Sequence, residues 1–285
     1  MASTQCNRRP LASSSPACGR KAPRGSVRAA ALPVDPDDQP GPSTSSTLAN
    51  PTGSLAHLWP SVCWSRYHVQ VLFVDRTDTV RARLAAGLFE RCAEWNGYGR
   101  VLCPWTCGLA VGAPMSIEAV SKLTALMSGA DALEILPRYF TRPAEAFELP
   151  DLDRYDLVMA LDSGILAELR MAVMAEYGPG AERDYYLQKV CLLTTFSHYE
   201  SESVLTRKGG FALLPSKLSA LLKANKGGFK ASQDVVDVPS PDLSGPDGAA
   251  QWAATVAALI TATASLVKYC IDAYPENMPH WDPVD

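Results

Sequence analysis

The residues whose types and spacing could do chemistry lie between positions 75 and 81. Asp75 and Arg81 enclose a polar loop that contains Thr77, Asp78 and Thr79. An arginine presents a planar fork of donors that suits a phosphate or a carboxylate. Two carboxylates and a threonine hydroxyl could instead hold a magnesium ion. The loop is therefore consistent with an anion site, a metal site or an ordinary turn.

Hydrophobic periodicity predicts the elements that position this loop. Residues 68–74 are a short apolar run rich in β-branched side chains, which is typical of a buried strand. Residues 82–95 then repeat apolar side chains with helical spacing. A loop that leads into a helix presents unpaired N–H groups and the positive end of the helix dipole, so this junction is suited to anions. A purely structural strand-to-helix turn is the alternative.

The rest of the chain predicts an α/β fold. Further strands are expected near residues 100–105, 155–161 and 189–194, and helices over 117–128 and 165–177 separate them. Strands that alternate with helices form parallel sheets covered by helices on both faces. No internal repeat is visible. The sequence therefore predicts one α/β domain after an N-terminal extension.

Residues 68–82 resemble the opening of a low-molecular-weight protein tyrosine phosphatase. In that family a strand ends in a nucleophilic cysteine, five residues follow, and an arginine opens a helix. Here Asp75 stands at the cysteine position and Arg81 at the arginine position. Gly108 after the second strand and the sequences at 155–162 and 189–193 also resemble the family. The resemblance covers residues 66–273 and implies a three-layer α/β/α fold with a four-stranded parallel sheet.

The departures from the family pattern concern the catalytic groups. The family needs a thiolate as nucleophile, which Asp75 cannot supply. Two like unit charges about 4 Å apart repel by roughly 4 kcal/mol at an effective dielectric constant near 20, and a phosphate dianion would feel about twice that. Ser240 stands where the family has its general-acid aspartate, and a serine cannot donate a proton usefully near neutral pH. Asp242 could substitute only after a shift of its loop.

Three functional readings follow from the resemblance. In the first, no catalytic residue, metal or cofactor is expected, and an Asp75–Arg81 contact closes the loop of a non-catalytic binding or scaffold protein. In the second, the protein is a residual or metal-assisted phosphatase that acts on phosphotyrosine or small aryl phosphates through Asp75, Asp78 and Arg81. In the third, Arg81 anchors a carboxylate or phosphate ligand without turnover, with Thr77, Asp78 and Thr79 beside it.

The N-terminal composition predicts the location. Residues 1–34 carry five Arg, one Lys and no acidic residue. This composition is typical of an organellar transit peptide, and the sequence at 27–30 resembles a stromal processing site, which favours the chloroplast stroma. A disordered tail is the alternative. Residues 35–65 are interpreted as a linker.

Charge outside the transit peptide limits the partners. Removing residues 1–34 leaves 20 basic against 30 acidic residues, a formal charge of −10, which disfavours general nucleic-acid binding. Residues 200–233 are predicted to be an insertion with a short helix through Leu218, Leu221 and Leu222. Its segment 207–230 carries lysines 217, 223, 226 and 230 and either is a solvated surface or binds an unidentified acidic protein partner. Residues 274–285 form a C-terminal tail.

Two further features have alternative interpretations. Residues 249–267 contain no charge, but their large apolar side chains follow one helical stripe, so a core helix is expected rather than a membrane span. Cys103 and Cys107 lie four residues apart and are either a redox pair or buried thiols.

Overall fold

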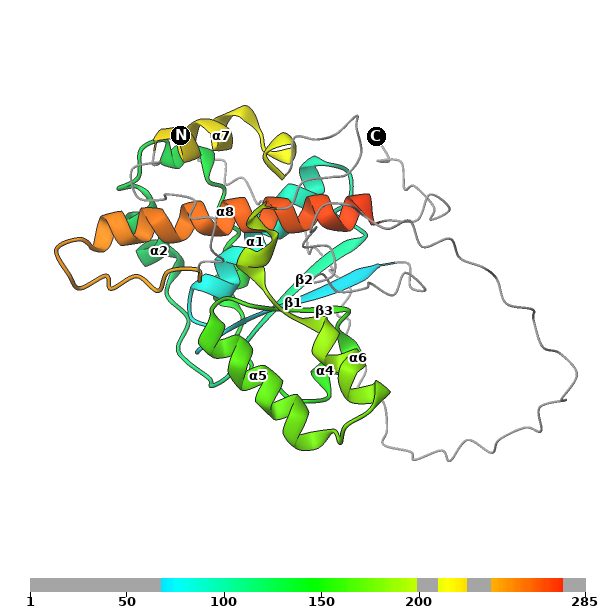
Figure 1. Cartoon of the computed structure of the whole chain (residues 1–285). Helices are drawn as coiled ribbons and strands as arrows, with labels where there is room; N and C mark the ends of the chain where they lie inside the picture. The colour runs from blue at the N-terminus through cyan, green and yellow to red at the C-terminus, as the bar shows by residue number, and fades with distance from the viewer. Residues whose placement is uncertain (1–67, 199–209, 225–236, 274–285) are drawn as a thin grey trace, which may run out of the picture. The chain divides into compact units, whose positions relative to one another are not determined.

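A parallel β-sheet forms the centre of the fold in the computed structural model (Figure 1). The structure describes residues 68–198, 210–224 and 237–273, all within one compact unit that covers residues 54–285. The predicted transit peptide, the whole linker and the C-terminal tail lie outside the described residues. Those three assignments stay predictions.

The sheet has four strands in the order β2-β1-β3-β4, all parallel. Strand β1 (Val69–Asp75) lies at the centre, and every residue in it except Gln70 is buried. A strand covered on both faces is expected to be apolar throughout, which is why β1 shows no strict alternation. The other strands are β2 (Leu102–Gly108), β3 (Leu157–Ala160) and β4 (Val190–Leu192). All four predicted strands are confirmed within three residues at each boundary.

Helices cover both faces of the sheet and make the predicted three layers (Figure 1). On one face α1 (Arg81–Trp95) and α8 (Gly248–Asp272) form the larger core with β1 and β2. On the other face lie α4 (Asp151–Arg154), α5 (Ser163–Glu176) and α6 (Ala181–Lys189). Shorter elements complete the α1–α8 side: α2 (Ile117–Thr124), α3 (Pro137–Thr141), α7 (Ser216–Ala224), and the 3₁₀ turns η2 (Ala130–Ala132), η3 (Leu193–His198) and η4 (Gly210–Leu213).

Helix α8 is a core helix of this domain. Among the described residues it is the one helix long and apolar enough to cross a bilayer, yet 83% of its most apolar window is buried inside the fold. The burial extends beyond the predicted stripe, because η3 and η4 also pack against the helix and its small residues allow close approach. A Cβ added at Gly210 would lie only 2.4 Å from the Ser265 nitrogen. The expectation of a core helix agrees with this packing.

Two expected helices have different boundaries or surroundings. The helix predicted over 117–128 ends at Thr124, and Gly129 follows in the left-handed region at φ 78°. In α7 the three predicted leucines are 1–5% exposed and pack into the larger core, while Lys217 and Lys223 are exposed. Lys226 and Lys230 lie outside the described residues. The insertion helix is therefore anchored to the domain by its apolar face.

The interpretation of Cys103 and Cys107 as a redox pair is wrong. Both thiols are free and lie on the single strand β2. Four residues of extended chain separate their Cα atoms by about 13 Å, which is far beyond disulfide reach. Burial raises the pKa of both thiols. They are buried or half-buried thiols of the sheet.

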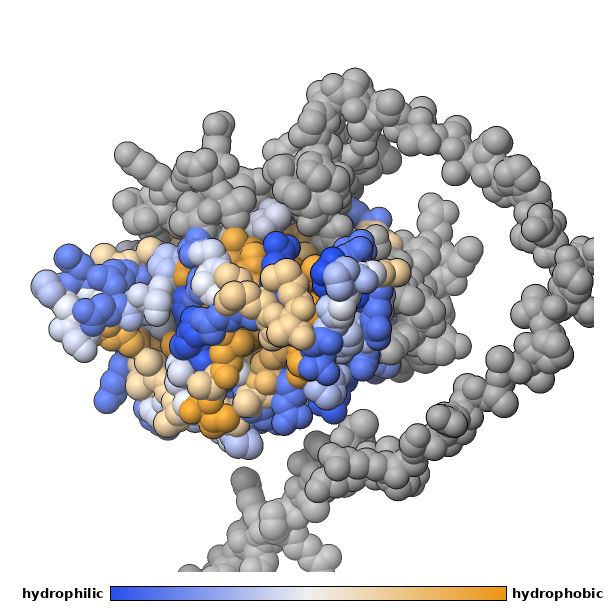
Figure 2. Space-filling model, turned by 60° about the horizontal axis from the view of Figure 1, so that its bottom comes forward, coloured by the Kyte–Doolittle hydropathy of each residue, from blue (hydrophilic) through white to orange (hydrophobic). Residues whose placement is uncertain are grey.

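The surface carries scattered apolar side chains. Met171 and Met174 on α5 are 56% and 50% exposed, and Figure 2 shows one face on which hydrophobic patches lie between hydrophilic ones. Single exposed apolar side chains are normal on soluble domains. They identify no interface by themselves.

Candidate functional site

The candidate site lies at the carboxyl ends of β1 and β3. Asp75 is the last residue of β1, and Asp162 follows β3 by two residues and caps α5. Strand order reverses here, because the chain moves from β1 out to β2 and then returns to the other side of β1. In open α/β sheets such a switch point is the usual place for a ligand crevice. The loop singled out by the sequence is therefore at the expected position.

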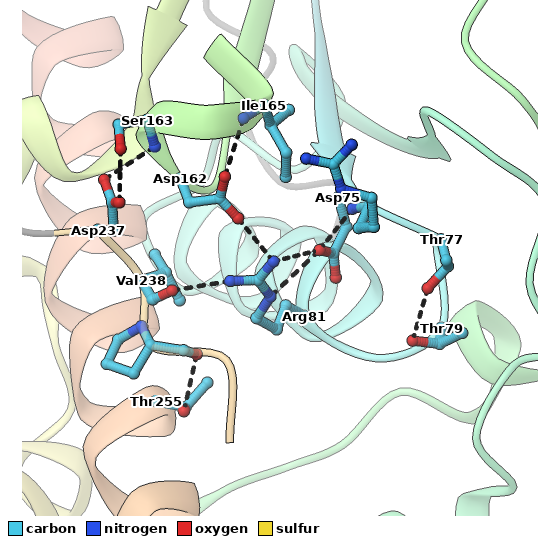
Figure 3. Close-up of polar contacts among 12 residues, drawn as sticks. Asp75, Thr77, Thr79, Arg81, Asp162, Ser163, Ile165, Asp237, Val238 and Thr255 are labelled. Atoms are coloured by element: carbon cyan, nitrogen blue, oxygen red, sulfur yellow. Dashed lines mark hydrogen bonds and ion pairs between the residues drawn. The ribbon is translucent and has the colours of Figure 1, made fainter. Parts of the chain in front are cut away.

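Arg81, the first residue of α1, donates hydrogen bonds to three residues (Figure 3). Its Nε and Nη2 groups donate to Asp75 Oδ1 over 3.1 and 2.6 Å, and Nη2 also donates to Asp162 Oδ2 over 2.9 Å. Its Nη1 donates to the carbonyl of Val238 over 2.8 Å. The Arg81 side chain is 6% exposed. The predicted Asp75–Arg81 contact is confirmed, and two further acceptors complete it.

The electrostatics of Arg81 follow from these partners. Burial lowers its pKa, but the charge of Asp75 and the hydrogen bonds to Asp75 and Asp162 outweigh burial and raise the pKa above the ordinary value. The guanidinium therefore stays charged, and its charge is compensated within the protein. A buried charge is tolerated only with such pairing.

Asp75 acts as an internal anion of the loop. Its Oδ1 accepts from both Arg81 groups and from the backbone N–H of Arg76, over 2.7 Å. The Asp75 side chain is 5% exposed. A carboxylate with three donors on one oxygen occupies the donors that an external oxyanion would need.

The loop backbone is held from outside by residues 109–115. The N–H groups of Leu109, Ala110 and Gly112 donate to the carbonyls of residues 75, 76 and 77 over 3.0 Å, and that of Met115 donates to residue 79 over 3.1 Å. A Cβ at Gly108 would lie 2.8 Å from the Asp78 nitrogen and 2.4 Å from the Ala110 carbonyl oxygen. Glycine is therefore required where this segment crosses the loop. This requirement explains why a glycine stands at position 108.

Asp78 points away from Asp75 and pairs with Arg83. The Asp78 Oδ2 accepts from Arg83 Nη2 over 2.8 Å, and the two side chains are 1% and 0% exposed. Arg83 Nε also donates to the Asp78 carbonyl, and Nη1 donates to the carbonyls of Tyr139 and Arg142. Burial raises the pKa of Asp78, although Arg83 opposes the shift. Asp78 adopts φ 49°, a left-handed conformation that aspartate tolerates better than most residues.

The sequence did not predict the Asp78–Arg83 pair, and the pair changes the metal reading. Asp75 and Asp78 each bind a different arginine, so their carboxylates do not converge on a common point. In the described part of the chain, no group of three or more His, Cys, Asp or Glu residues is placed to hold a metal ion. In this structure the two carboxylates of the predicted magnesium site are each engaged by an arginine. The available signal in the sequence was Arg83 itself, because an arginine in the first turn of α1 indicates an acidic partner in the preceding loop.

The remaining predicted site residues make no hydrogen bond or ion pair with the Arg81 side chain in the described part of the chain. The hydroxyls of Thr77 and Thr79 are 3.3 Å apart and face each other (Figure 3). Ser240 and Asp242 are exposed. Asp242 accepts from the Ser244 N–H over 3.0 Å and so caps the turn before α8. The structure thus does not bring Asp242 to the position of a proton donor beside Arg81.

Sequence reasoning missed Asp162 and Asp237. Asp162 Oδ1 accepts from the Ile165 N–H over 2.9 Å as the N-cap of α5 while Oδ2 binds Arg81. Asp237 accepts from the N–H and hydroxyl of Ser163 over 2.9 and 2.7 Å. An aspartate between a strand and a helix is a recognised cap signal. The additional contact with Arg81 required the tertiary structure.

Comparisons with known proteins concern the fold. No family model and no curated protein matches the chain. Similar solved structures include a protein tyrosine phosphatase from Entamoeba histolytica, with 12% identity, TM-score 0.46, and coverage of 71% of this chain and 97% of that one. A low molecular weight protein tyrosine phosphatase from T. tengcongensis has 17% identity, TM-score 0.42, and coverage of 70% and 99%. The YwlE arginine phosphatase from Geobacillus stearothermophilus has 16% identity, TM-score 0.43, and coverage of 71% and 93%. These likenesses transfer no residue's role to this chain, whose fold resembles that of low molecular weight protein tyrosine phosphatases.

Proposed function

We propose that this chain is a non-catalytic binding or scaffold protein built on a phosphatase-like fold. The observation that carries the proposal is the closed state of Arg81, whose guanidinium binds two carboxylates and a backbone carbonyl of the same chain. Phosphoryl chemistry at this loop would need a nucleophile, a proton donor and donors free to hold the phosphate.

Each of these requirements lacks a suitable group. By the resemblance, Asp75 stands at the nucleophile position and Ser240 at the general-acid position. The Asp75 Oδ1 accepts from three donors. An incoming phosphate dianion would also meet the negative charges of Asp75 and Asp162. At a separation of about 4 Å, the repulsion between the phosphate and each of these carboxylates would cost several kcal/mol. The closed arrangement supports binding through other surfaces rather than turnover at this loop.

Turnover of an aryl phosphate tests this proposal directly. The full-length chain, its Arg81→Ala variant and an Arg76→Ala variant would be assayed with and without Mg²⁺. Arg76 is the matched control, because it lies in the same loop but is half exposed and, among the described residues, its side chain pairs with Glu168. We expect the three proteins to show one indistinguishable background rate. Turnover that is lost in Arg81→Ala and kept in Arg76→Ala would overturn the proposal and support the alternative of a residual or metal-assisted phosphatase.

We also propose that the protein works in the chloroplast stroma. The basic, acid-free composition of residues 1–34 supports this location. Import of the full-length chain into isolated chloroplasts, followed by sequencing of the new N-terminus, tests it. Cleavage near residues 27–34 with protection from external protease is expected. Failure to enter chloroplasts would contradict the localisation without affecting the assignment of the loop.

A protein partner would bind through the basic segment 207–230. The described part of this segment supports the proposal because α7 is fixed by its buried leucines and leaves Lys217 and Lys223 exposed. Replacing both lysines by glutamate should weaken binding to an acidic peptide such as poly-glutamate, whereas replacing Lys122 on α2 should not. Equal binding by all three proteins would argue against this surface.

A further inference from the structure

A short segment before α8 lies against the candidate site and is held there at each of its three residues. This segment, Asp237–Pro239, is called the strap. The Val238 N–H donates to the Leu161 carbonyl over 3.0 Å, and the Pro239 carbonyl accepts from the Thr255 hydroxyl of α8 over 3.0 Å. Asp237 binds Ser163 at the start of α5 (Figure 3). The strap therefore bridges β3, α5 and α8.

Arg81 connects the strap to the loop. Its Nη1 donates to the Val238 carbonyl, while Nε and Nη2 hold Asp75. The Val238 side chain is 1% exposed and belongs to the larger core. If the strap moved away, Arg81 would lose an acceptor in a buried position, and a buried donor without a partner is costly. If the loop lost Asp75, the charge of Arg81 would lose its main compensation.

We infer that the strap and the loop 75–81 form one coupled unit that opens and closes through Arg81. In the closed state the Val238 carbonyl satisfies a buried donor of Arg81. The strap thus helps to keep the guanidinium engaged within the chain. An event that displaces the strap frees the Nη1 group of Arg81, and an event that displaces Asp75 loosens the strap. This coupling goes beyond the proposed non-catalytic function, because it holds whether or not the loop turns over a substrate.

Amide hydrogen exchange on the full-length chain tests the coupling from the strap side. Thr255→Val removes, with little change in shape, a hydroxyl that lies within hydrogen-bond distance of the carbonyls of Pro239, at 3.0 Å, and of Gln251 in its own helix, at 2.9 Å. Thr261→Val is the matched control, because the Thr261 hydroxyl is also buried in α8 and donates to the carbonyl four residues earlier, as the Thr255 hydroxyl does, but makes no bond to the strap among the described residues. Thr255→Val should speed exchange of the Val238 amide and, by about the same factor, of the loop-bound Arg76 and Leu109 amides. A rise of about fivefold is expected from the loss of one hydrogen bond.

The reciprocal variant tests the coupling from the arginine. Arg81→Met should speed exchange at Val238 by about tenfold or more, because hydrogen bonds to charged groups contribute more than neutral ones. If the Arg81→Met variant does not fold, the Thr255→Val variant alone tests the coupling between the strap and the loop. Faster exchange at Val238 with unchanged Arg76 and Leu109 amides in Thr255→Val would overturn the coupling. Equal acceleration in α6, on the opposite layer, would indicate global loosening and would overturn it as well.

The hydrogen-exchange experiment and the turnover experiment test the coupling and the proposed function separately. Turnover that depends on Arg81 would remove the non-catalytic assignment and leave the exchange result intact. Unchanged loop exchange in Thr255→Val would remove the coupling and leave the turnover result intact.

Discussion

Asp75 Oδ1 lies 2.6 Å from Arg81 Nη2, and the two side chains are 5% and 6% exposed. This pair places an internal carboxylate where the loop would otherwise present an arginine to a ligand. The charge of the site is therefore balanced without any external anion. The predictions below follow from this pair and from the buried groups around it.

Asp75→Asn should strengthen binding of inorganic phosphate, because it removes a negative charge from the loop while keeping a side chain of the same shape. The repulsion removed is roughly 4 kcal/mol at 4 Å, so a detectable gain is expected even after partial loss of order in the loop. Calorimetric titration of phosphate measures it. The control is Asp242→Asn, an exposed aspartate that does not contact Arg81. An affinity equal to that of the control would contradict the role given to Asp75.

Arg83→Met should destabilise the fold by about 3–5 kcal/mol, because it leaves Asp78 buried without its compensating charge. The double variant Asp78→Asn with Arg83→Met should recover part of this loss. Urea unfolding of the two single variants and the double variant gives the coupling free energy. As a control, Arg76→Ala removes an exposed pair and should cost less than about 1 kcal/mol. Simple additivity of the two single changes would show that the pair is not coupled.

Stability should fall as the pH rises above 9, because four thiols of the described residues are buried: Cys92, Cys107, Cys191 and Cys270. Burial raises the pKa of Cys92, Cys191 and Cys270 from 9.0 to about 12. Above pH 9 the unfolded chain loses these protons while the folded chain keeps them, so a rise in pH favours unfolding. Each thiol should cost about 1 kcal/mol at pH 10. Urea unfolding at pH 8 and pH 10 measures the difference, and Cys92→Ala should reduce it by the contribution of one thiol, about 1 kcal/mol.

Mg²⁺ should not raise the melting temperature. A ligand that binds only the folded state stabilises it by mass action, so an assembled metal site would give a concentration-dependent increase. Asp75 and Asp78 are each paired with an arginine, and we expect equal melting temperatures in millimolar Mg²⁺ and in chelator. A rise with Mg²⁺ that disappears in Asp75→Asn would favour the metal-assisted phosphatase.

The fold and the loop could be read from the sequence because their signals are local. The apolar run that forms β1 and the helical repeat that forms α1 lie on either side of the loop, so Asp75 and Arg81 were placed at a strand end and a helix start. Their contact also followed, since the five residues of loop between them cannot separate them far. The same local logic predicted the buried leucines of α7.

Contacts between distant segments could not be read in this way. Asp162 is 81 positions from Arg81 and Val238 is 157, and nothing in either local sequence specifies the meeting. Parallel pairing of β1 with β3 brings Asp162 to the site, and the packing of α8 brings Val238. The direction of Asp78 was also missed, because the left-handed backbone at that residue turns its carboxylate toward Arg83.

The sequence by itself determined the order of the elements, the parallel sheet and the internal Asp75–Arg81 pair. These depend on hydrophobic period and on short loops, which act within a few residues. The tertiary structure alone decided that Arg81 would also bind Asp162 and the Val238 carbonyl, that Asp78 would pair with Arg83 and that the strap would lie against the site. Those outcomes depend on which buried donors and acceptors remain to be paired after the layers pack, and that is a property of the assembled core.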